Sequence, residues 1–401
     1  MASLPDLPAV TRLSNYVTRI LGQNPGKFTL QGTNSYLIHH PSSPRLLLLD
    51  TTGPSSVSPL SASSVQSYTT HLRSALAAHP AQPARVTDVV LSHWHGDHVM
   101  ALGEVLRALH DATSAAPDAV RVWKMACAGG GTDAWKGEEG KEGEIEGSLD
   151  EAAKEGLLEV DEQGRRVRPL ASGQRFVLPG EGEAHADASV EIEVVHTPGH
   201  TSDSICLVLR TSAASSPSPA IDANESPLGV FTADTVLGHG TAVFHSLSAY
   251  LSSLTALFDL FPPSGPGSSA LVPLYPGHGD VVPDGRAKIE EYRTHRMERE
   301  RQVVEALQAG TAGESAELSA SELTDRIYAS TIPDSLKPAA THGLLLHLAK
   351  LQEEGRVERV SRRSVQEEGE REKQMGEIQL PAGWDDGWKW IEGREGAGGR
   401  L

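Results

Sequence analysis

The amino-acid sequence predicts a mixed α/β fold. Between residues 11 and 49, short apolar runs are separated by turn residues, a pattern typical of antiparallel strands. Residues 86–92 have the composition of a buried strand, and residues 99–109 follow with helical spacing. The alternation continues to about residue 308, with strand-like runs at 190–195, 204–209, 229–232 and 271–274 and helical patterns near 246–260 and 286–308.

Composition limits the class of protein. The chain has 401 residues, and 35 Lys and Arg against 53 Asp and Glu give a formal net charge of −18. A hydrophobic share of 38% and a charged share of 22% are ordinary for globular proteins, and the length predicts two or three domains. These values exclude a wholly disordered chain, and the acidic charge disfavours nucleic acid as a partner unless basic residues cluster locally.

The sequence also predicts a compartment. No apolar run approaches the ~18–20 residues that cross a bilayer, so no membrane partner is expected. The segment Met1 to Pro8 lacks the basic and apolar parts of a secretory signal, and Cys127 and Cys206 are the only cysteines. We therefore expect a reducing, cytoplasmic location, with the mitochondrion as the alternative.

We expect a main domain over residues 11–308 that carries two surface insertions. Residues 128–157 are rich in Gly, Glu and Lys, and residues 211–227 are rich in Ala, Ser and Pro. Such compositions bury too little apolar surface to offset the entropy of the chain. The charged tail over 361–401 is expected to be mostly disordered, although its tryptophans can pack on the body: Trp384, Trp388 and Trp390.

A small second domain is predicted over residues 314–360. Helical patterns at 319–329 and 337–355 precede a strand-like run at 356–360, which indicates a winged-helix-like unit. The preferred role for this unit is a helical cap on the main domain or a contact in a homodimer. Nucleic-acid binding is the alternative.

The segment His93-Trp-His95-Gly-Asp97-His98 carries the strongest sign of metal chemistry. It follows a buried strand, so its loop can aim several side chains at one point. Imidazole and carboxylate groups are the ligand types that suit zinc and similar ions. A packing role does not explain four such groups within six residues, so we predict a metal site here.

Three further positions each follow a strand-like run and lie beside Gly or Pro. They are His196 in His-Thr-Pro-Gly-His200, Asp234 in Thr-Ala-Asp-Thr, and His278 in Tyr-Pro-Gly-His. Gly and Pro let the backbone bend sharply, so these side chains can point out of a sheet edge. With the first segment they provide enough ligands for two metal ions that share a bridging water.

The sequence closely resembles the metallo-β-lactamase superfamily and, within it, the β-lactamase-like protein 2 group of glyoxalase II-related hydrolases. The resemblance spans roughly residues 11–358, interrupted by the insertions. It rests on Arg19 to Asn34, His93 to His98, His196-Thr-Pro-Gly-His-Thr201, Ala233 to Gly238, Thr241 to Phe244, Tyr275-Pro-Gly-His278 and Thr341 to Leu348. It implies an αββα sandwich with the site along one edge of its two sheets, followed by a small C-terminal winged-helix-like domain.

The resemblance also implies a ligand set for two zinc ions, although manganese or iron can occupy similar sites. The first ion is expected on His93, His95 and His196, and the second on Asp97, His98 and His278, with Asp234 bridging. Asp97 is also expected to act in catalysis by orienting the attacking hydroxide. His200 is expected to contact the metal ligands, to face the substrate, or to be a structural turn residue.

Three departures from the family pattern affect the expected walls of the site. The chain has Asp50-Thr-Thr-Gly53 in place of Asp-Thr-Gly, Ala233-Asp234 in place of Gly-Asp, and Val99-Met-Ala-Leu-Gly103 where a Gly-Gly is usual. None of the three departures changes a predicted ligand, so they bear on the fit of the substrate and not on metal binding.

The ligands alone do not choose the substrate, because one metal pair can hydrolyse thioesters, lactones, β-lactams or phosphodiesters. In the resembling group, fungal members look like thioesterases that release polyketide acids from an acyl carrier protein in secondary metabolism, and animal members look like endoribonucleases. A thiolate is a good leaving group that needs little acid catalysis (free thiol pKa about 8.5), which suits a site made almost entirely of ligands.

We therefore predict a dinuclear zinc thioesterase that acts on an acyl carrier protein. Cleavage of single-stranded RNA is the first alternative, although RNA would require a basic channel with stacking aromatic residues, and the sequence shows none. A non-catalytic binding protein on the same fold is the second, and the complete ligand set argues against it. Glyoxalase II activity remains a further enzymatic option.

Overall fold

The computed structural model describes residues 4–55, 61–112, 119–128, 138, 140–181, 188–213, 227–262, 271–310, 317–328, 331–360 and 386–391. The chain divides into two compact units, one made of Met1–His245 and Ala249–Glu290 and the other of Ser246–Ser248 and Glu291–Leu401. The domain boundaries expected near residues 308 and 314 stay predictions. Within the described residues, no helix is long and apolar enough to cross a membrane.

The first unit contains a seven-stranded sheet in which the strands follow chain order. The expected antiparallel opening is confirmed, because β1 to β4 are antiparallel neighbours, and β4 to β7 then pair in parallel. The strands are β1 (Val10–Arg12), β2 (Val17–Leu21), β3 (Asn34–His39), β4 (Arg45–Leu49), β5 (Arg85–Leu91), β6 (Arg121–Lys124) and β7 (Val167–Pro169).

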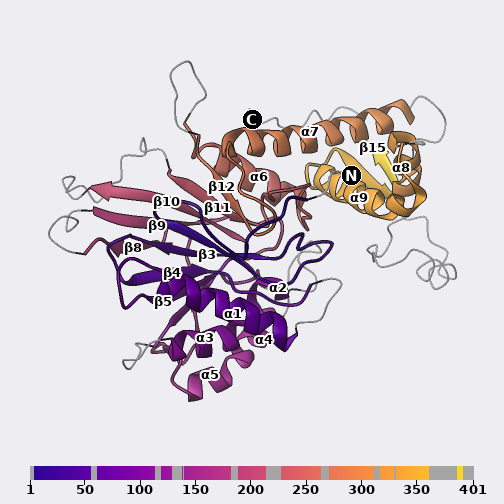
Figure 1. Ribbon diagram of the computed structural model, residues 1–401. Coiled ribbons are helices and arrows are strands. Elements are labelled where there is room, and N and C mark those ends of the chain that lie inside the picture. Colours follow the sequence, from indigo (N-terminus) through magenta and orange to yellow (C-terminus); the bar gives the residue numbers. More distant parts are fainter. Residues whose placement is uncertain are drawn as a thin grey trace. The chain divides into compact units, whose positions relative to one another are not determined.

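A second sheet of five strands packs face to face on the first (Figure 1). Its strands are β8 (Arg175–Pro179), β9 (Ala188–His196), β10 (Ile205–Ala213), β11 (Gly229–Ala233) and β12 (Leu274–Pro276). Strands β8 to β11 are antiparallel, and β12 pairs in parallel with β11. Alternate residues of both sheets, among them Ile38, Leu47, Ile192 and Leu207, form the core between them, and each is fully buried.

Helices cover the outer face of the first sheet (Figure 1). They are α1 (Ala62–Ala77), α3 (Leu102–Asp111), α4 (Lys141–Ser148) and α5 (Asp150–Lys154), and the short α2 (Gly96–Val99) precedes α3. Their apolar side chains, such as Tyr68 and Leu106, pack on the outward residues Leu46 and Val89. Burial of each such side chain contributes roughly 1.5–3 kcal/mol.

The prediction that 128–157 is a surface insertion is wrong for its second half. Ile145, Leu149, Ala152 and Leu157 are all buried in the core beneath α3. Composition misled because these few apolar residues stand at helical spacing among many Glu and Gly residues, so one face is apolar although the average is polar. Residues 129–137 and 214–226, which make up most of the rest of the two expected insertions, lie outside the described residues.

The second sheet is also covered on its other face, which completes the αββα sandwich (Figure 1). Cys206 and Val208 point to that face of β10 and are fully buried. Helix α6 (Leu247–Phe258) contributes Tyr250 and Leu254, both fully buried, to the same layer. Helix α7 (Gly285–Gly310) begins in the first unit and continues into the second.

The second unit has the expected winged-helix architecture. Its described elements are β13 (Glu317–Ser319), α8 (Ala320–Tyr328), the 3-10 helix η2 (Asp334–Leu336), α9 (Lys337–Glu353), β14 (Val357–Val360) and β15 (Gly387–Trp390). The three strands form a sheet in the order β13-β15-β14, and α8 and α9 pack their apolar faces, including Leu323 and Leu348, into its core.

The expectation of a mostly disordered tail over 361–401 is wrong for residues 386–391. Strand β15 lies between β13 and β14 and pairs with both. The side chain of Trp388 is 3% exposed within the core of the second unit. Sequence composition did not reveal this strand because it is only four residues long, Gly-Trp-Lys-Trp, and lies within a long charged region. Trp384 lies outside the described residues.

Replacing the buried Trp388 tests whether the tail is part of the second unit. Trp388→Ala should lower the free energy of unfolding of that unit by about 3–5 kcal/mol, the usual cost of deleting a buried aromatic side chain. Urea unfolding, followed by hydrogen exchange of α8 and α9, measures the change. Lys389→Ala, at the exposed neighbouring position, is the matched control, and equal stability of the two variants would contradict the buried strand.

Candidate metal centre

The site lies where strand ends from both sheets meet. Strands β4 and β5 are parallel, so the residues that follow them emerge at the same edge of the first sheet. Strands β9 and β11 are both antiparallel to β10, and β12 is parallel to β11, so the carboxyl ends of β9, β11 and β12 share an edge of the second sheet. The Ile205 amide donates to the Ser92 carbonyl at 3.0 Å and joins the two edges.

Close backbone packing fixes the loop that carries the histidine motif. His95 precedes α2, and the backbone of Gly53 lies against the start of that helix. A Cβ atom at Gly53 would stand 1.9 Å from the Gly96 carbonyl oxygen and 2.7 Å from the Asp97 Cα. The loop therefore approaches the end of β4 more closely than any side chain at residue 53 would allow.

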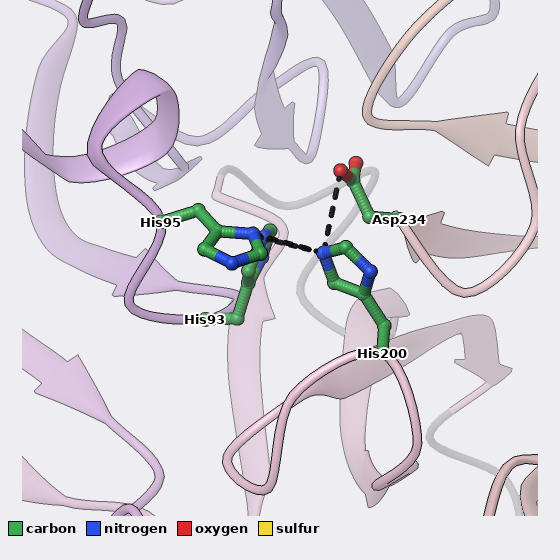
Figure 2. Close-up of side chains that lie close together, drawn as sticks. All are labelled: His93, His95, His200 and Asp234. Atoms are coloured by element: carbon green, nitrogen blue, oxygen red, sulfur yellow. Dashed lines mark hydrogen bonds and ion pairs between the residues drawn. The ribbon is translucent and has the colours of Figure 1, made fainter. Parts of the chain in front are cut away.

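Four side chains converge to form the first group of candidate ligands: His93, His95, His200 and Asp234 (Figure 2). Nε2 of His200 lies 2.9 Å from Nδ1 of His95 and 3.2 Å from Nε2 of His93. Oδ2 of Asp234 lies 3.6 Å from the same His200 nitrogen. Three imidazole nitrogens and one carboxylate oxygen thus face a common point.

The second group consists of Asp97, His98 and His278. Oδ2 of Asp97 lies 3.3 Å from Nε2 of His98 and 3.1 Å from Nε2 of His278. Oδ1 of Asp234 lies 3.5 and 3.4 Å from these two nitrogens. The carboxylate of Asp234 therefore stands between the groups, with one oxygen toward each.

The structure does not bring His196 into either group, so His200 takes the place that the sequence prediction gave to His196. His196 ends β9, and its Nε2 lies 2.7 Å from the carbonyl oxygen of Ser202. Gly199 has φ of +146° and packs against Tyr250, which turns the chain so that His200 enters the cluster. The other predicted residues, from the 93–98 segment, Asp234 and His278, are brought together as expected.

The tautomer of His200 follows from its hydrogen bond. Nδ1 lies 2.7 Å from the carbonyl oxygen of Val243, which can only accept, so Nδ1 carries the hydrogen. Burial lowers the pKa of His200, so the ring is neutral and Nε2 presents a lone pair. That lone pair faces the Asp234 carboxylate at 3.6 Å, an arrangement of two acceptors that suits a cation between them.

The histidines of the two ligand groups differ in the direction of their pKa shifts. Burial and neighbouring imidazoles lower the pKa of His95 to about 3 and hold that of His93 well below its usual value, so both rings are neutral. Burial opposes protonation of His278 as well, but the Asp234 and Asp97 carboxylates raise its pKa to about 9. Asp97, Asp50 and Asp234 likewise overcome burial and raise the pKa of His98. The carboxylates are thus stabilised by nearby positive charge, which a divalent cation would supply.

Several residues that the sequence did not single out as functional support the ligands. Asp50 is 1% exposed, and its Oδ2 lies 2.9 Å from Nδ1 of His98. Oδ1 accepts from the Ser92 amide, and Oδ2 accepts from the Ser92 hydroxyl. Thr33 donates to Asp97 at 3.2 Å. Asp50 therefore supports a candidate ligand and does not only line the wall of the site. The feature of the sequence that could have indicated this role is its position directly after β4, the strand parallel to β5. Imidazole ligands commonly have such carboxylate partners.

A third group of Cys127, Glu138 and Asp203 also lies close together, but it already has a cation. The buried ammonium of Lys124 lies 2.7 Å from Asp203 and 3.4 Å from the Cys127 sulfur. Burial, followed by the Asp203 charge, raises the pKa of Cys127 to about 12, so its thiol is protonated. This group therefore has a structural role beneath the loop of His200.

Two stacked sheets with clustered His and Asp side chains at one edge define the class of a metallo-β-lactamase-type hydrolase domain, here followed by a winged-helix unit. Comparisons agree with this assignment. The metallo-β-lactamase superfamily model matches residues 28–211, and the β-lactamase-associated winged helix domain model matches residues 319–364. A β-lactamase domain protein from Burkholderia ambifaria has a similar fold, with a TM-score of 0.56, 17% identity and coverage of 96% of this chain and 95% of that one.

Sequence relatives extend over nearly the whole chain. The β-lactamase-like protein 2 homolog of Drosophila melanogaster is 33% identical over 90% of this chain and 96% of its own length. A protein named atrochrysone carboxyl ACP thioesterase from Paecilomyces divaricatus is 29% identical over 89% of this chain and 86% of its own length. The chain belongs to the metallo-β-lactamase superfamily, in the group that contains the β-lactamase-like protein 2 homologues.

The metal content of two variants tests whether His200 or His196 is a metal ligand. His200→Ala should reduce bound metal by about one equivalent, because one of the three imidazoles in the first group is lost. His196→Ala should keep the full metal content and lose about 1 kcal/mol of stability with its hydrogen bond to Ser202. Elemental analysis after dialysis measures both. Loss of metal from the His196 variant alone would restore the assignment made from sequence.

Removal of the negative charge of Asp50 tests whether Asp50 positions the His98 ring for metal binding. Asp50→Asn should weaken metal binding at the second group by about 10- to 100-fold, the range found when a carboxylate partner of an imidazole ligand is removed. Competition with a chromophoric chelator measures the affinity. Asp88→Asn is the matched control, because Asp88 is also buried but binds Arg121 and Trp123 away from the cluster. Equal metal affinities of the two variants would refute the role of Asp50.

Proposed function

We propose that this protein is a dinuclear metal hydrolase that cleaves acyl thioesters carried by an acyl carrier protein. The observation that carries the proposal is the position of Asp234 between two groups of candidate ligands, at the end of a cavity that apolar and polar side chains line together. His93, His95 and His200 would hold the first ion, and Asp97, His98 and His278 the second, with Asp234 shared. Zinc suits these donors, and manganese or iron also fit.

When bound, such a pair of ions supplies a hydroxide nucleophile near neutral pH. The protein's own side chains prepare the site for this chemistry. Neutral His93 and His95 offer lone pairs, and Asp50 fixes the ring of His98. Asp97 stays ionised, because His98 and His278 lower its pKa against the opposing effect of burial, and we assign to it the orientation of the attacking hydroxide. A thiolate leaves without acid catalysis, so no further proton donor is required.

The cavity beside the ligands favours a thioester over RNA. It encloses about 460 Å³, and apolar residues contribute much of its lining: Phe28, Leu30, Pro54, Leu237, Ala242 and Val243. Among the described residues that line it, Lys27 is the one Lys or Arg. A polyphosphate strand would require several cations and aromatic residues for stacking, whereas the described cationic or aromatic residues that line this cavity outside the ligand groups are Lys27, Phe28, His239 and His245.

The winged-helix unit also gives little support to an RNA partner. Among the residues of this unit that the structure describes, several basic side chains are engaged with carboxylates of the same unit. Such pairs join Lys337 to Asp325, Lys350 to Glu300, Arg301 to Glu298, Arg356 to Glu354 and Arg359 to Asp386.

A binding protein without turnover is equally disfavoured, because no candidate ligand is missing. The relatives named as ACP thioesterases are consistent with a polyketide acid as product, and a homodimer remains a prediction.

Thiol release tests the proposed reaction. The zinc-loaded protein should hydrolyse an acyl thioester of acyl carrier protein, and His95→Ala should reduce the rate by about 100-fold or more, at least the loss expected for a supporting residue. His110→Ala, an exposed histidine on α3, is the matched control and should keep full activity. A labelled single-stranded RNA incubated in the same buffer should stay intact. RNA cleavage without thiol release would overturn the proposal in favour of an endoribonuclease.

A further inference from the structure

The cavity beside the ligand cluster carries apolar side chains on two of its walls, and the hydrolytic reaction does not itself require them. Polar side chains, Thr29, His239, Thr241 and His245, also line the cavity. It is lined by His95, Asp97, His200, Asp234 and His278 at one end, so it opens directly onto the reacting position. Phe28 on one wall and Val243 on the other are 58% and 53% exposed. Large apolar side chains that remain exposed beside a catalytic cluster indicate a surface that a substrate covers.

The first wall is a tight turn that is held rigidly. Gly26 donates to the Leu30 carbonyl at 3.1 Å, and Leu30 has a positive φ of 53°, which is strained for a leucine. The Thr29 hydroxyl donates to the Asn24 carbonyl at 2.7 Å, and the Asn24 side chain donates to the Gly53 carbonyl at 3.1 Å. The turn therefore presents Phe28 in a fixed position, anchored to the same Gly53 that packs against the metal-binding loop.

The second wall is joined to the metal centre through its backbone. The Val243 carbonyl accepts from Nδ1 of His200 at 2.7 Å, while its side chain lines the cavity. The next residue, Phe244, is buried and stacks on Tyr250 with ring centroids 5.0 Å apart. This packing holds the Val243 side chain at a fixed distance from the ligand that its carbonyl orients.

We propose that these walls form a subsite for an apolar, uncharged acyl chain, with Phe28 and Val243 as the residues that determine chain specificity. This inference rests on the proposed thioesterase function. The reacting carbonyl must lie at the ligand cluster, so the group that continues from it lies between the two walls. Of the two substituents of a thioester carbonyl, the acyl chain matches Phe28 and Val243, whereas the pantetheine arm carries polar amides that these two side chains cannot satisfy.

Binding of thioethers that cannot be hydrolysed tests the subsite without turnover. Suitable probes are S-(2-oxoalkyl)pantetheines, in which a methylene separates sulfur from the carbonyl, with alkyl chains of roughly two to eight carbons. Kd for the metal-loaded wild-type protein should fall by about two- to fourfold for each added methylene, as expected when apolar surface leaves water. Phe28→Ala and Val243→Ala should each reduce this gain per methylene, while the shortest probe binds with nearly unchanged affinity.

Matched variants separate specificity from folding. Val177→Ala, at an exposed valine on β8, should keep the wild-type dependence on chain length, and Phe28→Leu should restore most of the gain that Phe28→Ala loses. Because Phe28 and Val243 are both exposed, the substitutions should leave the unfolding transition nearly unchanged.

The results also separate this inference from the proposed reaction. A gain per methylene that persists unchanged in both Phe28→Ala and Val243→Ala would overturn the subsite, as would affinity that depends on the pantetheine arm and not on alkyl length. A chain-length dependence that both variants weaken, found in a protein that hydrolyses no thioester, would support the subsite while refuting the thioesterase proposal.

Discussion

Alignment of strand ends at one edge of the sandwich is the constraint on which the candidate metal centre depends. The core between the sheets, with residues such as Leu47 and Leu207 fully buried, fixes the distance between the end of β5 and the ends of β9, β11 and β12. Each of these strands is followed by a turn that contributes at least one ligand candidate. No single segment could assemble both groups, because the donors come from residues as far apart in sequence as His93 and His278.

Charge at this edge is balanced by geometry and burial together. Asp97 and Asp234 are largely shielded from water and ionised, and Asp50 lies behind them as a third buried acid. Concentrating carboxylates in a low-dielectric region is costly unless positive charge is present. The protonated state of His98 and His278 supplies it in the absence of a cation. The cluster is therefore built around positive charge, and the proposed metal pair would supply that charge together with a nucleophile.

Much of this arrangement could be predicted from sequence. The alternation of strands and helices, the antiparallel opening and the histidine motif after β5 follow from local patterns, and the αββα order follows from the family resemblance. The choice between His196 and His200 could not be made in the same way, because both lie in one turn of the same composition. Only three-dimensional contacts, the packing of Gly199 on Tyr250 and the bond from His200 to Val243, decide which ring enters the cluster.

The other errors share a physical cause. Helices α4 and α5 and strand β15 are short segments within polar, Gly-rich stretches, so their average composition resembles that of a flexible chain. Their buried residues, Ala152 and Trp388 for example, are stabilised by partners distant in sequence. Local composition does not report such contacts.

The hydrogen bond from His200 to the Val243 carbonyl has a consequence for how substrate preference can change over evolutionary time. The segment that shapes the cavity also fixes a ring of the cluster, so an insertion or deletion there would move the ligand along with the wall. Exchange of the Val243 side chain leaves the carbonyl in place. Divergence of preference at this wall should therefore proceed by substitution at constant loop length. The tip of the cavity's other wall, at Lys27 and Phe28, bears no ligand and can vary in both length and composition while its base stays anchored to Gly53.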